Sequence, residues 1–486
     1  MDSPTKNKKQ ILFALSECVP FIKSGGLADV GGALPVALNR KRNLEVSVIM
    51  PQYSAIPHTL LRKLEPVCSF ELYVGWRKKY CGINKLKHRG VTFYFVDNRD
   101  YFFNDYLYGY GSYEAERFAF FNIAVLEALP HIGLSPDVIH CHDWQTAMIP
   151  ALLNIRYAYS SPWDNIKTVF TIHNLRYQGV FDANLASDYF GLDRHFVDSG
   201  LIGHNNALNF LKGALSYSDK ITTVSPTYSM EIMTNWGGEG LEYKLAERHL
   251  DVMGILNGID EKLNNPADDI DIPYSFSADD LSGKARCRKA LRIEAGLPDK
   301  KNTPVIGMIG RLTSQKGLDL VEHVLDGILQ EDLQLVVLGT GDAKYAEMFK
   351  KYSKKYPEKL SAFITFDSAL AKRIYAGSDM FLMPSLFEPC GLAQMISLKY
   401  GTLPIVRETG GLKDTVFSYV EASDSGNGFT FSAYNAHDML FTIKRAVMFY
   451  KKKKNIWEKM QLSGMTSDFS WKASAKHYMD LYLNLL

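Results

Sequence analysis

Short apolar runs alternate with amphipathic stretches along most of the chain, and this alternation limits the possible folds more than any other feature of the sequence. Helical periodicity marks residues 114–129 and 209–218, which lie between runs without a polar face. Such runs are typical of the buried strands of a parallel sheet. The alternation therefore predicts a doubly wound α/β domain. We expect its strands at residues 11–16, 45–51, 91–96, 138–141, 168–172 and 220–224.

A second series of the same kind follows a break in the pattern between about residues 263 and 302. The break contains the turn-rich, acidic segment 264–269. The simplest architecture is two Rossmann-like domains that face each other across a cleft. Because ligands bind beyond the carboxyl ends of strands in open α/β sheets, we expect the functional site in that cleft. The second series consists of expected strands at 305–309, 333–338, 360–366, 379–384 and 403–406 and expected helices at 318–329, 342–356, 369–376, 436–450 and 471–486.

The composition excludes several classes of protein. Of the 486 residues, 46% are hydrophobic and 22% are charged, which is ordinary for a soluble globular protein. No apolar stretch approaches the roughly 18 residues that span a bilayer. The formal net charge is only +2, so no strong field attracts nucleic acid or anionic lipid. We expect neither a nucleic-acid partner nor a membrane partner.

The cysteines and the N-terminal segment indicate a reducing compartment. Six scattered cysteines, with no CxxC pair, favour free thiols over a disulfide scaffold or a zinc site. The polar segment 1–10 has no apolar region of the kind that signal peptides carry. We therefore expect a cytoplasmic protein.

The turn after the first expected strand contains Lys23, Gly25, Gly26 and Asp29. Its two glycines let the backbone approach a ligand, and a helix beginning near Asp29 would direct N–H groups at an anion. Neither a GxGxxG fingerprint nor a P-loop is present. An ordinary strand-to-helix turn with an exposed lysine explains this motif equally well.

Histidines follow two other strands of the first series. His140 and His142 precede Asp143, and His173 precedes Asn174. The three histidines could suggest a metal site, but no carboxylate or thiolate set with metal-ligand spacing completes it, so we expect no metal. Histidines packed at the end of a sheet are the simpler interpretation. Asp143 is the better candidate for contact with a polar ligand.

Two loops of the second series carry charge. Arg311 and Lys316 follow its first expected strand, and an Arg fork with a second cation suits phosphate oxygens. Glu388 lies between an aromatic residue and a proline, and Cys390, Gly391 and Leu392 come just before an expected helix. For the first loop the alternative is a solvated surface loop. For the second it is a carboxylate that only complements a helix dipole. Thr409, Gly410 and Gly411 predict a second glycine turn of the kind expected after the first strand.

Together and in this order, these motifs are far more specific than any one of them. From about residue 11 to the C-terminus the chain resembles the bacterial glycogen synthase and plant starch synthase family, retaining glucosyltransferases of the two-Rossmann (GT-B) architecture. The resemblance implies transfer of glucose from ADP-glucose to the non-reducing end of an α-1,4-glucan such as glycogen, with no cofactor. It rests on residues 23–30, 140–144, 171–179, 254–260, 310–317, 385–392 and 409–414.

The resemblance also implies the boundaries and the roles of residues. It gives an acceptor-side domain at 1–263, a nucleotide-sugar domain at 264–465, and a last helix at 466–486 that packs back on the first domain. Its catalytic residues are Glu388, His173, Arg311, Lys316 and Asp143. Its substrate-binding residues are Lys23, Gly25, Gly26, Asp29, Asn174, Asn257, Cys390, Gly391, Leu392, Thr409, Gly410 and Gly411.

Retention raises the question of mechanism. A double displacement needs two carboxylates close to the anomeric carbon, whereas Glu388 and Asp143 are expected on different domains. We therefore favour front-face attack, with the departing phosphate as the base for the acceptor hydroxyl.

Departures from the family pattern leave base selectivity open. Arg176 and Leu386 differ from the usual residues, Ala393 replaces a frequent Thr or Ile, and Ile396 stands where related families place a ribose-binding Glu.

Three alternative functions stay open. The first is a transferase that uses UDP-sugars or sugar-phosphate acceptors, and the second is a glycogen phosphorylase, whose pyridoxal-lysine motif we do not find. The third is a silent glucan-binding protein. The sequence does not indicate the oligomeric state.

Overall fold

The computed structural model describes residues 8–41, 43–104 and 106–486. The start of the polar N-terminal segment, residues 1–7, lies outside the described residues. The chain forms two compact units, one ending at Ile255 and including Trp471–Leu486, the other formed by Leu256–Ser470. We had expected these boundaries after residues 263 and 465. The difference arises because Ile259 donates its N–H to the Phe469 carbonyl at 2.8 Å, which ties the segment after Ile255 to the second unit.

The main sheet of the first unit has the strand order β12-β11-β7-β6-β1-β2-β5-β4-β3 within the described residues. Neighbours from β12 to β5 are parallel, and all six expected strands lie in this part. The antiparallel hairpin of β3 and β4 was not predicted, because most of its residues are exposed or partly exposed and form no apolar run. The strands are β1 (Lys9–Ala14), β2 (Leu44–Pro51), β3 (Glu65–Val74), β4 (Arg77–His88), β5 (Val91–Asp97), β6 (Val138–His142), β7 (Lys167–Ile172), β11 (Lys220–Thr223) and β12 (Val252–Gly254).

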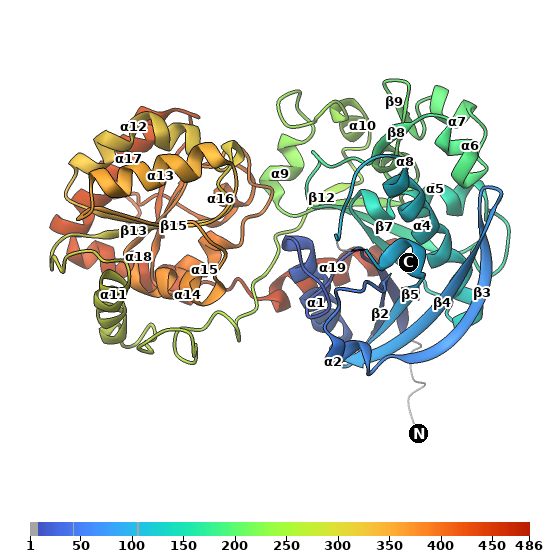
Figure 1. Ribbon diagram of the computed structural model, residues 1–486, viewed down its shortest axis with the longest axis horizontal. Helices are drawn as coiled ribbons and strands as arrows, with labels where there is room; N and C mark the ends of the chain where they lie inside the picture. The colour runs from blue at the N-terminus through green and yellow to red at the C-terminus, as the bar shows by residue number, and fades with distance from the viewer. Residues whose placement is uncertain (1–7, 42, 105) are drawn as a thin grey trace. The chain divides into compact units, whose positions relative to one another are not determined.

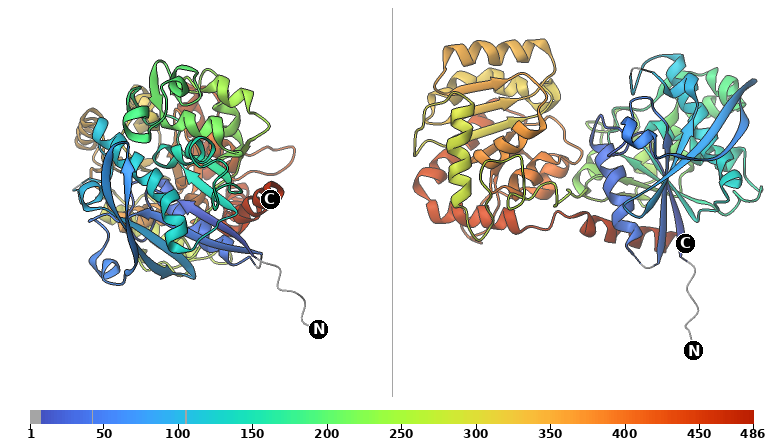
Figure 2. Two further views of the ribbon diagram at one scale, coloured as in Figure 1. Left: turned by 90° about the vertical axis from the view of Figure 1, so that its right-hand side faces the viewer. Right: turned by 60° about the horizontal axis from the view of Figure 1, so that its bottom comes forward.

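Helices and a small second sheet complete the first unit. The last helix of the chain, α19, packs against α1 (Figure 2). The expected return of the last helix to the first unit is therefore confirmed. The helices are α1 (Gly26–Asn39), α2 (His58–Leu61), α3 (Arg99–Phe102), α4 (Ser112–Ile132), α5 (Met148–Ile155), α6 (Leu185–Phe190), α7 (His195–Asp198), α8 (Phe210–Tyr217), α9 (Pro226–Glu231), α10 (Glu242–Glu247), α19 (Trp471–Leu485) and the 3-10 turn η1 (Trp144–Thr146), and the small sheet has β8 (Val180–Asp182), β9 (Gly203–His204) and β10 (Ala207–Asn209).

The second unit is built on a parallel sheet with the order β15-β14-β13-β16-β17-β18 within the described residues. Helices α12, α13 and α17 cover one face, and α11, α14 and α15 cover the other (Figure 1). The elements are β13 (Val305–Ile309), β14 (Gln334–Leu338), β15 (Leu360–Phe363), β16 (Met380–Met383), β17 (Leu403–Arg407), β18 (Phe429–Phe431), α11 (Ser282–Glu294), α12 (Leu318–Gln330), α13 (Ala343–Lys355), α14 (Ser368–Gly377), α15 (Ala393–Lys399), α16 (Gly410–Thr415), α17 (Ala436–Lys452), α18 (Lys454–Thr466) and the 3-10 turn η2 (Ser314–Lys316).

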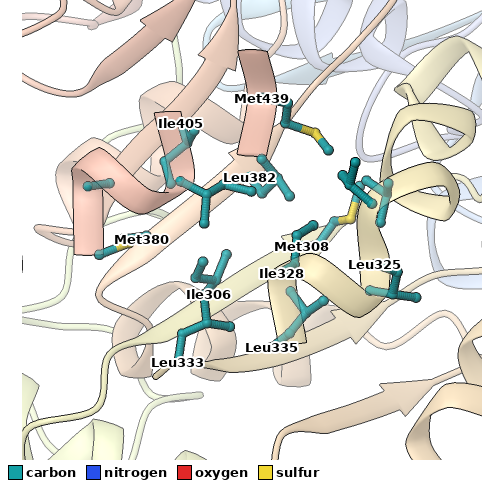
Figure 3. Packing of buried hydrophobic residues seen from close by; sticks show 14 of the residues in the cluster. Ile306, Met308, Leu325, Ile328, Leu333, Leu335, Met380, Leu382, Ile405 and Met439 are labelled. Carbon is teal, nitrogen blue, oxygen red and sulfur yellow. The ribbon is translucent and has the colours of Figure 1, made fainter. Parts of the chain in front are cut away.

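The core of the second unit follows the predicted apolar runs. Figure 3 shows Ile306, Leu335 and Leu382 from the strands packed with Ile328 of α12 and Met439 of α17. Two α/β units with largely parallel sheets confirm the doubly wound α/β class.

Helix α11 falls in the region where the helical pattern lapses. It carries five basic residues, and two of them, Lys284 and Arg292, are buried. Lys284 donates to the carbonyls of Ala376 and Tyr400 at 3.1 and 2.8 Å. Hydrogen bonds donated by buried basic side chains replace apolar contacts here, so the helix carries a weak apolar signal in the sequence.

None of the helices in the described ranges has the length and hydropathy needed to cross a bilayer.

Candidate active site

In the main sheet of each unit, the polar motifs follow strands near the point where the order of strand addition reverses, so that the next strand is added on the other side of the first one. In the second unit the chain runs from β13 through β14 to β15 and then returns to pair β16 with the other side of β13. In the first unit β1 likewise separates β2 from β6. Open α/β sheets bind ligands at such switch points, beyond the carboxyl ends of the strands. Each unit therefore carries its motifs where its own sheet can bind a ligand.

A small, partly open pocket with a cavity volume of about 80 Å³ lies at the switch point of the second unit. The pocket brings together Arg311, Lys316 and Glu388, and Gly391 and Leu392 also line it. Asn257, Cys390, Thr409, Gly410 and Gly411 do not line it.

Lys316 and Glu388 form an ion pair inside this pocket, with 2.6 Å between Lys Nζ and Glu Oε2. Glu388 is only 7% exposed. The Ser385 hydroxyl donates to the same carboxylate oxygen at 3.1 Å. The carboxylate is thus held in one orientation by a cation and a hydroxyl.

Arg311 is exposed beside this pair. The one hydrogen bond found for its guanidinium, among the described residues, is a long contact of 3.5 Å with Gln315 Oε1. A guanidinium has five N–H donors, so most of this fork can serve a ligand oxygen. Together, the side chains of Arg311, Lys316 and Glu388 carry a formal net charge of +1.

The two loops of the pocket are joined by backbone contacts. Leu386 N–H donates to the Gln315 carbonyl at 2.9 Å. Arg407, at the end of β17, donates to the carbonyls of Ser385 and Leu386 at 3.3 and 2.6 Å. At Gly317 (φ 71°) a Cβ would lie 2.0 Å from the Pro384 carbonyl oxygen, so only glycine fits there. Our sequence reasoning included Ser385 in a motif but gave no role to Ser385 or Arg407, although both lie next to strand ends.

The glycine turn at 409–411 supports the Glu388 loop from behind. A Cβ on Gly410 would lie 2.0 Å from the Glu388 carbonyl oxygen, and one on Gly411 would lie 2.0 Å from that of Cys390. Gly411 N–H donates to the Glu388 carbonyl at 3.2 Å. In this structure these glycines permit close backbone packing rather than line the pocket.

Two other predicted residues are buried beside that loop. Burial raises the pKa of the Cys390 thiol to about 12, so the thiol is protonated and unreactive. Asn257 is 5% exposed, and its Oδ1 atom has no hydrogen-bond partner among the described residues. A buried acceptor left in this way is a candidate for ligand contact.

In the first unit, the glycine turn after β1 leads into α1. The helix begins at Gly26, so the expected start near Asp29 was three residues too late, because Asp29 belongs to its first turn. Lys23 forms an ion pair with Asp29, with distances of 2.7 and 2.8 Å from Nζ to the two carboxylate oxygens. Part of the Lys23 charge is thus already balanced within the turn.

Glu17 organises this turn and was missed by our sequence reasoning. It is 3% exposed and accepts backbone hydrogen bonds from Ser24 and Gly25. Burial raises the pKa of its carboxyl, although these bonds oppose the effect. An acidic residue three positions after a buried strand was the available signal.

Asp143 directly follows β6 in a strained conformation, with φ of 54°. Its Oδ1 accepts the backbone N–H of His173 at 2.8 Å, and it also accepts the N–H of Asn174. Burial nevertheless raises the pKa of its carboxyl to about 7. Asp143 therefore joins the two histidine loops.

The histidines of these loops are neutral at physiological pH. Burial lowers the pKa of His173 to about 3 and those of His140 and His142 well below the usual value. His142 Nδ1 and His173 Nε2 are 3.0 Å apart. Within residues 8–41, 43–104 and 106–486, no three His, Cys, Asp or Glu side chains are grouped as metal ligands.

The raised pKa of Asp143 predicts a pH-dependent stability effect. The folded protein binds this proton more tightly than the unfolded chain, so the contribution of Asp143 to stability falls as the pH rises from about 4 to about 7. Asparagine has the same shape as the aspartate that already adopts this backbone conformation, and its side-chain oxygen can still accept the His173 N–H. We expect Asp143→Asn to raise the melting temperature by roughly 4 °C at pH 8 and by clearly less at pH 5. Differential scanning calorimetry measures both values.

The exposed Asp164 provides the control, because Asp164→Asn should change the melting temperature equally little at both pH values. An Asp143→Asn gain that does not depend on pH would contradict the assignment of this pKa.

Comparisons with known proteins agree with the fold and the motifs. The starch synthase catalytic domain family matches residues 10–247, and glycosyl transferases group 1 match residues 291–461. A glycogen synthase of Alkaliphilus metalliredigens is 50% identical over 98% of this chain and 100% of its own length. A glycogen synthase of Clostridium novyi is 49% identical over 98% of this chain and 99% of its own length.

A solved structure shows the same architecture. The catalytic domain of starch synthase IV from Arabidopsis thaliana, bound to ADP and acarbose, superimposes with a TM-score of 0.89 at 34% identity, covering 98% of this chain and 99% of that one. Sucrose-phosphate synthase from Thermosynechococcus elongatus, with a TM-score of 0.60, 16% identity and coverage of 98% and 99%, shares the fold. These findings define a glycosyltransferase of the two-Rossmann (GT-B) class. Within that class, the chain belongs to the glycogen synthase family and is a glucosyltransferase.

Proposed function

We propose that this protein transfers glucose from ADP-glucose to the non-reducing 4-OH of an α-1,4-glucan, retains the anomeric configuration and releases ADP. The observation that carries the proposal is the pocket at the β13–β16 switch point, where Arg311 and Lys316 lie beside the held carboxylate of Glu388. The Arabidopsis relative was solved with ADP and acarbose, which supports a nucleotide and a glucan-like ligand for the fold.

Arg311 and Lys316 bind the diphosphate and stabilise the charge that develops on it as it departs. A cation about 4 Å from a phosphate oxygen is worth roughly 4 kcal/mol at an effective dielectric near 20, before desolvation. Lys316 has three N–H donors. One of them bonds Glu388, and the others remain for phosphate oxygens. Lys316 therefore links the leaving group to the carboxylate.

Glu388 orients the donor glucose and opposes the positive charge of an oxocarbenium-like transition state. Its ion pair with Lys316 and its bond from Ser385 keep the carboxylate in place before the donor arrives. Charge stabilisation by groups that need not reorganise is usually the largest single contribution to catalysis.

His173, Asn174 and Asp143 serve the sugar side. His173 is neutral, so it acts as a hydrogen-bonding group toward a sugar hydroxyl or through its backbone carbonyl, and not as a cationic acid. Asp143 accepts two backbone N–H groups and fixes the loop that carries His173. We assign the turn that contains Lys23, Gly25, Gly26 and Asp29 to donor binding.

The mechanism we propose is front-face attack. Glu388 is held by Lys316 and Ser385, and Asp143 by two backbone amides, so neither carboxylate is arranged as a free nucleophile. The departing phosphate accepts the proton of the acceptor hydroxyl, while the new glycosidic bond forms on the face that the diphosphate leaves.

No metal or organic cofactor enters this proposal, because Arg311 and Lys316 supply the cationic contacts to the diphosphate. Turnover should therefore be unchanged in EDTA. A cytoplasmic location, without nucleic-acid or membrane partners, remains a prediction from the sequence.

The test is nucleotide diphosphate release from ADP-glucose and from UDP-glucose, each with and without glycogen. We expect glycogen-dependent ADP release and little UDP release. A preference for UDP-glucose would overturn the proposal that ADP-glucose is the donor. No release from either, by folded protein that still binds glycogen, would favour a silent glucan-binding protein.

A further inference from the structure

A chain of buried rings connects the C-terminal helix with His173. Tyr482 of α19 is 0% exposed, and its hydroxyl lies 2.6 Å from His140 Nδ1. The other ring nitrogen of His140, Nε2, lies 2.6 Å from the Thr171 hydroxyl, which in turn lies 2.5 Å from that of Thr222. Both nitrogens of His140 are therefore satisfied by hydroxyl groups, one of them from the last turns of the chain.

His140 packs on His142, and His142 bonds His173. The His140 and His142 ring centroids are 4.1 Å apart, and Phe13 stacks on His142 at 5.3 Å with an interplanar angle of 22°. The contact between His142 Nδ1 and His173 Nε2 is 3.0 Å. The His142 ring is thus held by its neighbours, and its Nδ1 offers the His173 ring a hydrogen-bond partner in a defined position.

Hydrogen bonds, and not charge, hold this arrangement. The three imidazoles are neutral because burial disfavours their protonation. Without the Tyr482 hydroxyl, His140 Nδ1 would be a buried nitrogen with no partner, a situation that proteins avoid. The His140 ring would turn or shift, and the stacked His142 ring would follow.

We propose that Tyr482 is a positioning residue for glucosyl transfer, acting through His140 and His142 on the ring of His173. This inference rests on the proposed role of His173 at the donor sugar. It gives the returning C-terminal helix a catalytic purpose in addition to packing.

The first test compares Tyr482→Phe with Tyr478→Phe. Tyr478 lies on the same helix, and its ring centroid is 5.6 Å from that of His140, so both variants keep a phenyl ring against the histidine. We expect kcat to fall roughly tenfold in Tyr482→Phe with KM changed less than about twofold. Tyr478→Phe should keep kcat within about twofold. Equal kcat in wild type and Tyr482→Phe would overturn the proposal.

A double-mutant cycle separates positioning from general loosening of the fold. If Tyr482 acts through His173, then Tyr482→Phe causes no further loss of kcat in a His173→Ala background. A full additional tenfold loss there would overturn the proposal. A His173→Ala variant with normal kcat would instead refute the proposed role of His173 itself, so the two failures are distinguishable.

A second variant covers the case in which Tyr482→Phe does not fold. His142→Phe keeps a ring against both Phe13 and His140 but cannot bond His173. It also removes Nε2 of His142, a buried atom without a hydrogen-bond partner in the described part of the chain. We expect the same fall in kcat, the same unchanged KM and the same absence of further loss in the His173→Ala background. Wild-type kcat in this variant would contradict the proposal.

Discussion

In a Lys316→Ala variant we expect kcat to fall about 10²–10³-fold, because two interactions are lost at once. The departing diphosphate loses one of its two cations. Glu388, 7% exposed, also loses the ammonium that lies 2.6 Å from it. Steady-state kinetics with ADP-glucose and glycogen measures the effect, and the affinity for ADP should weaken in parallel.

Lys350 supplies the matched control. It is an exposed lysine of α13 that pairs with Glu347 at 2.9 Å. Lys350→Ala removes the same charge from the same unit and should leave kcat within about twofold. A Lys316→Ala variant as active as Lys350→Ala would show that the pocket does not carry the chemistry.

A Glu388→Gln variant should also lose about 10²–10³-fold in kcat, but with a different binding signature. Glutamine keeps the shape of the side chain and can still accept the Ser385 hydrogen bond, so the loss reports the charge alone. Because Lys316 no longer shares its proton donors with a carboxylate, ADP should bind at least as tightly as to the wild type. Isothermal titration calorimetry distinguishes this from the weaker ADP binding of Lys316→Ala.

A Ser385→Ala variant perturbs the same carboxylate less than Glu388→Gln does. It removes the 3.1 Å hydroxyl bond and keeps the ion pair. We expect a loss of kcat of about tenfold or less. If Glu388→Gln were no more harmful than Ser385→Ala, the carboxylate charge would not stabilise the transition state.

The sequence predicted those parts of the fold that bury apolar surface on both faces. Strands such as β13 (Val305–Ile309) match their expected bounds. The β3–β4 hairpin and α11 were missed, because an exposed hairpin and a helix with buried cations lack the apolar runs on which the prediction depended.

For the candidate site, the sequence indicated the loops but not the contacts between them. Arg311, Lys316 and Glu388 follow strand ends, and strand ends meet at a switch point. The pairing of Lys316 with Glu388 depends on rotamers of residues 72 positions apart, which no spacing rule provides. Tyr482 was likewise out of reach, because one buried tyrosine in an amphipathic helix looks like any other core residue until its hydroxyl is seen beside His140.

The most direct test of the whole account is the product itself. The protein would be incubated with glycogen and ADP-glucose labelled with ¹³C at the anomeric carbon, and the polymer examined by NMR. The account predicts label in the glucan as α-1,4-linked residues, together with an equal amount of ADP. Label in β-linked residues would contradict retention, and label found only in free glucose would contradict transfer to a glucan.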